Sequence, residues 1–300
     1  MKESGPSRGR VAFDFIVVAL IWGSTWLVIK DQISEVPPGW TVTWRFALAS
    51  IGMFALALFR RESLRLDRQA MVLVMLIGLF QFCANVQFVY RAEAYLTSGL
   101  VAVIYALLMV PNALLSRLFL KTPLGGRFLA GSAVTMVGIA LLLINEARAA
   151  PAGTAVTLGI ALALAGLLSA SATNVMQAGS TARRLPTVPL IAWAMLWGTL
   201  FDAVFSWVIS GPPQFDSRGA YWGGVAYLAM LGSVVTFPLY YNLIRTMGAG
   251  RAAYTGVLVP VVAMALSTLF EGYRWTGLAT AGSVLAIAGL LIALSGKKAA

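Results

Sequence analysis

The sequence predicts an all-α integral membrane protein whose ten transmembrane helices form two inverted five-helix repeats. Three observations lead to this fold class: the proportion of apolar residues, ten long apolar runs, and a similarity between the two halves of the chain. Hydrophobic residues make up 59% of the chain and charged residues 11%, against about 25% charged residues in ordinary soluble domains. Lipid is therefore the expected surroundings of most of the surface.

Missing residue types exclude several kinds of site. The 300 residues contain no His and a single Cys, Cys83. Disulfides, imidazole or thiolate metal sites and Ser/His or Cys/His catalytic pairs cannot be built from such a chain. We therefore expect no catalytic residue, no metal site and no cofactor. The net charge of +11 does not indicate a nucleic-acid partner, because the basic residues lie in short clusters between apolar runs.

Ten mostly apolar runs are long enough to cross a membrane, since a helix of about 20 residues spans roughly 30 Å of hydrocarbon. In order along the chain they are residues 11–29, 38–59, 70–90, 94–116, 126–144, 155–177, 187–209, 219–243, 250–270 and 275–295. They are too long and too rich in Leu and Ala for barrel strands, so helices are expected. A basic decapeptide precedes the first run, but no small-residue cleavage site follows it, which predicts an uncleaved span.

The basic residues predict the orientation. With the N-terminus in the cytoplasm, the cytoplasmic segments hold most of the 22 basic residues: Lys2, Arg8, Arg10, Arg60, Arg61, Arg65, Arg68, Arg117, Lys121, Arg127, Arg183, Arg184, Arg245, Arg251, Lys297 and Lys298. The opposite face holds only Lys30, Arg91, Arg148, Arg218 and Arg274. This positive-inside bias predicts a multi-pass protein of the inner (plasma) membrane with both termini in the cytoplasm.

The two halves of the chain resemble each other when one is shifted by 151 residues. The shift places Tyr90, Gly99, Ser116, Leu118, Phe119, Gly131, Ser132 and Gly138 on Tyr241, Gly250, Ser267, Leu269, Phe270, Gly282, Ser283 and Gly289. We therefore expect one five-helix repeat in residues 1–148 and a second in residues 149–300. Because five spans is an odd number, the second repeat must insert upside down. Inverted repeats are typical of secondary transporters, since exchanging the conformations of the two halves alternates access to a central cavity.

Several segments resemble those of EamA-type members of the drug/metabolite transporter superfamily. They are IWGSTW at 21–26, WRFALA at 44–49, AEAYLTSGLVAVIYALL at 92–108 and GRAAYTGVLVPVVAMALSTLFEGYRWTG at 250–277, which includes Pro260 and Glu271. The resemblance covers essentially the whole chain. It implies a ten-helix exporter with cytoplasmic termini and a cavity lined mainly by spans 1, 3, 4, 6, 8 and 9.

Within that superfamily the chain is most similar to YddG-type exporters of aromatic and other neutral amino acids. The expected function is thus export of amino acids, and of related small metabolites or drugs, by alternating access. The chain departs from the family pattern in the first repeat, where Met109 stands at the position of Pro260 and a proline follows only at Pro111. Lys121 stands near a position where many relatives carry Glu.

Polar and aromatic residues at membrane depth are the candidates for binding the solute, although each can instead hold helices together. On the third span Gln81 and Asn85 share one helical face, and their amides suit the carboxylate or ammonium of a zwitterion. The other candidates for substrate binding are Trp22 and Trp26 in span 1, Ser98 and Tyr105 in span 4, Asn174 in span 6 and Tyr254 in span 9.

Three charged residues have separate predicted roles. Arg45 lies about seven residues into the second span, too deep for a loop charge, and we expect it to pair with Glu93 as a gate or an orienting strut. A purely structural pair is the alternative. Asp202, midway along the seventh span, is a candidate proton site.

Small residues and prolines predict contacts and bends. Gly131, Gly138, Gly282 and Gly289 give spans 5 and 10 small faces, which indicate either packing between the repeats or dimerisation. Prolines at positions 111, 238 and 260 are expected to kink their helices and free backbone carbonyls.

Other functions fit the sequence less well. A membrane enzyme would need a His or a carboxylate pair within one span, and the chain has neither. A passive channel or a receptor does not require an inverted duplication, and no P-loop supports ATP-driven pumping. Among carriers, the alternative is a transporter of another polar metabolite, such as a sugar or a nucleotide sugar.

Overall fold

The computed structural model describes residues 8–33, 36–96, 98–149, 155–270 and 274–295, so Glu271 lies outside the described residues. Within these ranges ten helical spans are long and apolar enough to cross a membrane. The uninterrupted spans are α1 (Arg8–Gln32), α2 (Pro38–Phe59), α7 (Gly126–Ala149), α8 (Val156–Ala178), α10 (Thr187–Ser210) and α15 (Gly277–Leu294). Each begins close to the start of a predicted run, and the all-α fold with ten spans is confirmed.

The remaining four spans are built from more than one helical segment. Span 3 consists of α3 (Arg68–Ile77), η1 (Gly78–Asn85) and α4 (Val86–Ala92), and span 4 of α5 (Ser98–Ala106) and α6 (Met109–Leu120). Span 8 consists of α11 (Gly219–Ala229), η2 (Met230–Val235) and α12 (Thr236–Met247), and span 9 of α13 (Ala249–Ala252) and α14 (Thr255–Phe270). A short helix, α9 (Ser180–Arg184), connects spans 6 and 7.

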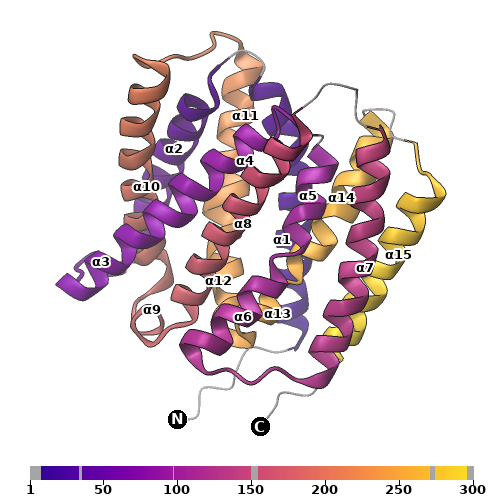
Figure 1. Cartoon of the computed structure of the whole chain (residues 1–300). Coiled ribbons are helices and arrows are strands. Elements are labelled where there is room, and N and C mark those ends of the chain that lie inside the picture. Colours follow the sequence, from indigo (N-terminus) through magenta and orange to yellow (C-terminus); the bar gives the residue numbers. More distant parts are fainter. Residues whose placement is uncertain (1–7, 34–35, 97, 150–154, 271–273, 296–300) are drawn as a thin grey trace.

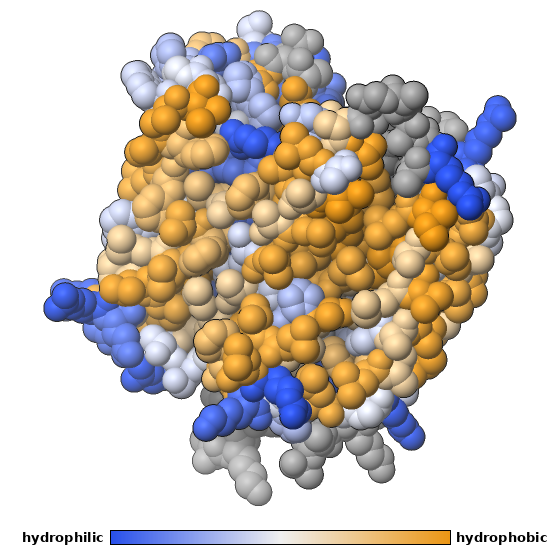
Figure 2. Space-filling model, viewed as in Figure 1, coloured by the Kyte–Doolittle hydropathy of each residue, from blue (hydrophilic) through white to orange (hydrophobic). Residues whose placement is uncertain are grey.

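The bundle has an apolar belt between two hydrophilic ends. Figure 2 shows hydrophobic side chains over the middle of the molecule and hydrophilic ones gathered toward its upper and lower ends. In Figure 1 the start of α1 and the end of α15 lie at the same, lower end. An apolar belt around helices whose backbone groups are paired internally is the surface that a lipid bilayer requires.

Spans 3 and 8 share an unusual local structure. The segments η1 and η2 are π-helical and cover nearly equivalent positions of the two halves under the 151-residue shift. Pro238 is the third residue of α12, the helix that follows η2, so its missing N–H falls next to the widened turn. Pro111 lies instead in the first turn of α6, where a proline is tolerated, and Pro260 lies inside α14. The three prolines that were expected to kink their helices therefore occupy different places: one next to a π-helical turn, one in a first turn and one in a helix interior.

Helix packing follows the two-fold relation between the halves. Span 1 packs against spans 8 and 9, and span 6 packs in the corresponding way against spans 3 and 4. Spans 2 and 7 pack together, as do spans 5 and 10, so each of these helices meets its own counterpart. Exchanging the five spans of one half for those of the other thus reproduces the main contacts, which agrees with two repeats of five helices.

The glycines of α7 and α15 bring these two helices into close contact. A Cβ atom added to Gly289 would lie 2.3 Å from Thr135 Oγ1 and 2.6 Å from the carbonyl oxygen of Gly131. A Cβ atom added to Gly138 would lie 2.6 Å from the carbonyl oxygen of Gly282. The structure therefore uses these glycines for packing between the repeats, which is one of the two predicted roles.

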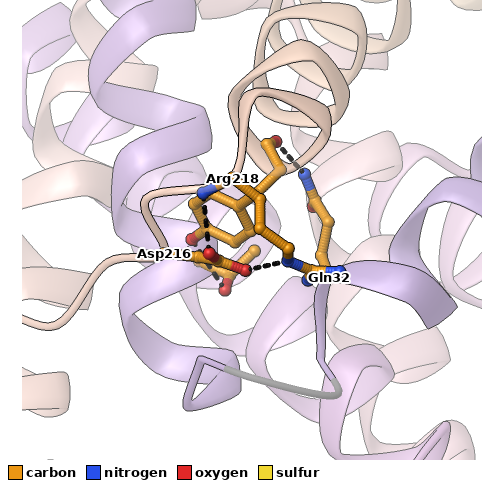
Figure 3. Close-up of polar contacts among 5 residues, drawn as sticks. Gln32, Asp216 and Arg218 are labelled. Carbon is orange, nitrogen blue, oxygen red and sulfur yellow. Dashed lines mark hydrogen bonds and ion pairs between the residues drawn. The ribbon is translucent and has the colours of Figure 1, made fainter.

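Hydrogen bonds fasten the loop between spans 7 and 8 at the upper end of the bundle. Asp216 accepts a hydrogen bond of 2.8 Å from the backbone N–H of Arg218 and an ion-paired one of 2.5 Å from its Nε (Figure 3). These interactions, the backbone hydrogen bond first, hold the pKa of the Asp216 carboxyl below its usual value. Nearby, Gln32 at the end of α1 donates to the carbonyl oxygen of Tyr221 at 3.2 Å. The end of span 1 is thus tied to the start of span 8.

Candidate solute-binding site

A cavity of about 130 Å³ lies at the centre of the bundle, which is room for on the order of ten water molecules. Spans 1, 2, 3, 4, 6, 8 and 9 contribute to its wall, so both halves of the chain build it. The residues that line it are Trp22, Thr25, Trp26, Ile29, Arg45, Gln81, Asn85, Val86, Val89, Tyr90, Tyr105, Leu108, Ala170, Asn174, Phe237, Tyr240, Gly256 and Val259. Seven of the predicted site residues are among them: Trp22, Trp26, Arg45, Gln81, Asn85, Tyr105 and Asn174.

Trp22 connects the first helix to the π-helical part of span 8. Its indole N–H donates to the carbonyl oxygen of Gly232 at 3.2 Å and to Thr236 Oγ1 at 3.0 Å. Its ring lies 5.6 Å from that of Phe237 and 4.8 Å from that of Tyr240, measured between centroids. These tilted aromatic contacts form an apolar wall that can receive the side chain of a solute.

Trp26, one turn further along α1, leaves a hydrogen-bond donor at the cavity. Its ring centroid lies 5.9 Å from that of Tyr105, and its indole N–H is buried without a hydrogen-bond partner in the part of the chain that the structure describes. Tyr105 donates instead to Asn85 Oδ1 at 2.5 Å. Gly166 makes room for this tyrosine, because a Cβ atom there would lie 2.5 Å from the Tyr105 hydroxyl. The unpaired indole N–H is therefore available to an acceptor on a solute or a water.

Amide side chains supply both donors and acceptors. Gln81 and Asn85 lie on η1, four residues apart, and both side chains face the cavity. Within the described residues, the Gln81 amide and the Asn85 amide nitrogen make no hydrogen bond, whereas Asn174 Nδ2 donates to the Tyr240 hydroxyl at 3.2 Å. Two free amide groups on one wall can bind carboxylate or ammonium groups of a small polar solute.

Arg45 provides the positive charge of the cavity. The side chain is only 6% exposed, and its guanidinium donates to the Tyr90 hydroxyl at 3.2 Å and to Ser233 Oγ at 3.3 and 3.4 Å. Tyr90 and Ser233 belong to spans 3 and 8, so the guanidinium joins the two halves. None of the described residues that line the cavity is acidic. The cavity thus offers a carboxylate one charged donor and no competing anion.

The structure does not bring Arg45 and Glu93 together as the predicted ion pair. No ion pair joins them in the part of the chain that the structure describes, and Glu93 does not line the cavity. Tyr90, one turn before Glu93 on the same helix, takes up the guanidinium with its hydroxyl instead. Glu93 is itself buried, with 5% of its surface exposed.

Asp202 lies outside the cavity, between spans 3 and 7. The carboxyl is fully buried, and Oδ1 accepts a hydrogen bond of 2.7 Å from Gln87 Nε2. The Cys83 thiol also interacts with the Asp202 carboxyl. Arg91 binds both the side-chain and the backbone oxygen of Gln87, and its guanidinium lies 4.9 Å from the Phe205 ring centroid. This network connects the buried acid to a cation near the end of span 3, and not to the cavity.

Two further candidates lie away from the cavity wall. Ser98 is buried at the start of α5, and its hydroxyl makes no hydrogen bond to a described residue. The Tyr254 hydroxyl lies 3.2 Å from Ser132 Oγ, and its ring contacts Phe128 edge-on, so it joins span 9 to span 5. Sequence reasoning missed Thr25, Tyr90, Phe237 and Tyr240. The internal repeat could have pointed to Tyr90, because the 151-residue shift places it on Tyr241. Nothing in the sequence distinguishes the other three from the many similar residues of the apolar spans.

Comparison with known proteins agrees with this architecture. The model of the EamA-like transporter family matches residues 11–144 and 157–295. This chain belongs to the EamA-like transporter family. It is a multi-pass membrane transporter of small-molecule solutes, not an enzyme, and each family match covers five of its ten spans.

Relatives of this EamA-like transporter share about a quarter of its residues. It is 24% identical to "Protein PagO" of Salmonella typhimurium, over 86% of this chain and 84% of that protein. It is 25% identical to the "Probable amino-acid metabolite efflux pump" of Escherichia coli, over 94% and 93%. It is 22% identical to the "S-adenosylmethionine/S-adenosylhomocysteine transporter" of Chlamydia trachomatis, over 89% and 84%. A protein of known crystal structure, 20% identical, superposes with a TM-score of 0.75 over 96% of this chain and 97% of that one, which supports the fold.

Proposed function

We propose that this EamA-like transporter exports amino acids, the aromatic and other neutral ones first, across the inner membrane by alternating access. The observation that carries the proposal is the combination of groups around one small cavity. Arg45 suits the α-carboxylate, the amides of Gln81 and Asn85 suit the polar head, and Trp22 with Tyr240 forms an aromatic wall for the side chain. The name of the Escherichia coli relative supports the same solute class.

A carrier of a larger polar metabolite is the second candidate, because one relative is named for S-adenosylmethionine transport. The volume of about 130 Å³ argues for a smaller solute, since pockets that hold drug-sized ligands measure about 300 to 1,000 Å³. Solutes of nucleotide size would require the wall to open further.

Counterflow in proteoliposomes tests the proposal. Vesicles loaded with unlabelled phenylalanine should accumulate labelled phenylalanine, and labelled sugars or nucleosides should not accumulate in the same way. Gln81→Leu and Asn85→Leu should abolish accumulation, whereas Gln69→Leu, an exposed glutamine at the start of α3, should leave it unchanged. Accumulation of sugars or nucleosides alone would favour the second candidate, and unchanged kinetics in both cavity variants would remove these amides from the binding site.

The orientation is part of the proposal. We place both termini in the cytoplasm, with repeats in residues 1–148 and 149–300, on the strength of the charge bias. Ser63 and Ser217 are exposed at opposite ends of the bundle, and the native Cys83 is buried, which keeps background labelling low. In intact cells an impermeant thiol reagent should label Ser217→Cys and not Ser63→Cys. The reverse pattern would mean that the chain inserts the other way round.

A further inference from the structure

A second and larger pocket, of about 790 Å³, opens at the lower end of the bundle. It lies where α6, α13 and the start of α7 meet, beside α9 and the end of α15 (Figure 1). On the orientation proposed above, this end faces the cytoplasm. Residues from both halves of the chain line the pocket, which is separate from the cavity that contains Arg45.

Among the described residues that line this pocket, four are arginines and none is acidic. Arg127, Arg183, Arg245 and Arg251 come from four different helices. A positive-inside bias accounts for basic residues in cytoplasmic loops, but it does not require four of them to converge on one concavity. A concave surface lined by positive charges concentrates the electrostatic field and so attracts anions.

Arg245 is the anchor of the pocket. Its two terminal nitrogens donate to the carbonyl oxygens of Leu185 at 3.0 Å and Ala182 at 2.8 Å, which hold the segment around α9 in place. Its Nε is buried and has no hydrogen-bond partner among the described residues. Arg183, on that same segment, is close enough for the two positive charges to repel each other. An anion between them would relieve the repulsion and use the unpaired donor.

The start of α7 adds backbone donors to the same surface. Gly125 and Gly126 line the pocket, and a Cβ atom on either would meet nothing within 4 Å, so the backbone there is open to a ligand. A helix of this length carries partial positive charge at its N-terminus, where anions are stabilised. The pocket therefore combines guanidinium groups with accessible backbone N–H groups.

The pocket lies about one helical turn from the central cavity. Along α8, Asn174 lines the cavity and Ala178 lines the pocket, a separation of about 6 Å for four residues. Buried polar groups fill the layer between the two spaces: Gln177 and the Tyr241 hydroxyl have no hydrogen-bond partner among the described residues, and Asn112 donates to the carbonyl oxygen of Ala249 at 3.1 Å. A solute leaving the pocket for the cavity would have to cross this layer.

We propose that this basic pocket is an anion-binding site that takes carboxylate- or phosphate-bearing molecules at the mouth of the transporter. Binding itself does not depend on the direction of transport. The consequence for solute choice does rest on the proposed function: anionic and zwitterionic solutes are concentrated at the inner mouth, and cationic solutes are repelled.

Calorimetric titration of the purified full-length protein with inorganic pyrophosphate tests the site. The wild type should bind it, and Arg183→Gln/Arg251→Gln should bind it at least about tenfold more weakly, because one hydrogen bond to a charged group contributes about 1.5 to 3 kcal/mol. Arg65→Gln removes an exposed cytoplasmic charge outside the pocket and should change nothing. Arg183→Lys/Arg251→Lys, which keeps both charges, should restore most of the binding. Equal binding by the wild type and the Gln double variant, or none by the wild type, would overturn the proposal.

Competition distinguishes the two natural sources of the anion. Displacement of pyrophosphate by micelles containing phosphatidylglycerol, but not phosphatidylcholine, identifies a lipid headgroup in the pocket. Displacement by soluble N-acetylphenylalanine identifies a small carboxylate, and either result supports the site. Counterflow separates this claim from the proposed export. Pyrophosphate binding without amino-acid counterflow would reject export and keep the site, and counterflow without pyrophosphate binding would do the opposite.

Discussion

The seam between α7 and α15 gives the most direct test of the packing. Gly289→Ala places a methyl group 2.3 to 2.6 Å from Thr135 and the Gly131 carbonyl oxygen, whereas non-bonded carbon atoms prefer about 3.5 to 4.0 Å. Two of the three nearest atoms belong to the backbone and cannot rotate away. The helices must therefore separate by about 1 Å, and overpacking of this kind destabilises a protein by roughly 1 to 3 kcal/mol.

The assay is thermal unfolding of purified protein in detergent, with Gly138→Ala as the equivalent change on the other helix. Gly223→Ala is the matched control, because Gly223 is an exposed residue within α11 whose Cβ would meet nothing within 4 Å. Alanine there should be neutral, or stabilising by up to about 1 kcal/mol. Unfolding midpoints of Gly289→Ala and Gly138→Ala at or above that of the control would refute the reasoning, since the seam would then have room for two methyl groups.

Three further outcomes are expected. Gly166→Ala should lower counterflow in folded protein, because the added Cβ would lie 2.5 Å from the Tyr105 hydroxyl and push it aside. Unchanged kinetics would show that this tyrosine does not shape the site. Asp202→Asn should retain counterflow, because Asp202 lies outside the cavity and asparagine still accepts from its neighbour; loss in folded protein would place the carboxylate on the solute path. The pKa of Asp216 is depressed, so its stabilisation of the loop is present above the unfolded pKa of about 3.9 and lost below it. A spin label at position 217 should therefore gain mobility only below about pH 4, and gain between pH 8 and 6 would contradict this.

The spans were predictable because hydrophobicity at membrane depth leaves little choice of structure. Runs of about 20 apolar residues must be helical, and the segments from Pro38 to Phe59 and from Thr187 to Ser210 begin where the sequence places them. Helix interruptions were less accessible. Pro111 suggested a kink, yet span 4 breaks before it, and the π-helical turns of η1 and η2 have no residue signature of their own.

The lining of the cavity was predictable where a polar residue at membrane depth has no other explanation. Gln81, Asn85 and Asn174 line the cavity as expected. Tyr254 does not, because a hydroxyl on the neighbouring helix satisfies it, and only the three-dimensional packing reveals that partner. Charge suggested Glu93 as the partner of Arg45, whereas the helix register brings the Tyr90 hydroxyl to the guanidinium.

The seam of α7 and α15 also records how the chain relates to itself. Gly289 meets Thr135, and their counterparts under the 151-residue shift, Gly138 and Ala286, meet each other as well. Such reciprocal contacts define an isologous interface, the kind formed by two identical subunits around a two-fold axis. In a symmetric pair every favourable substitution acts at two places at once. When both halves belong to one chain, each half can change alone. Thr135 and Ala286, which occupy equivalent positions of the two halves, already differ.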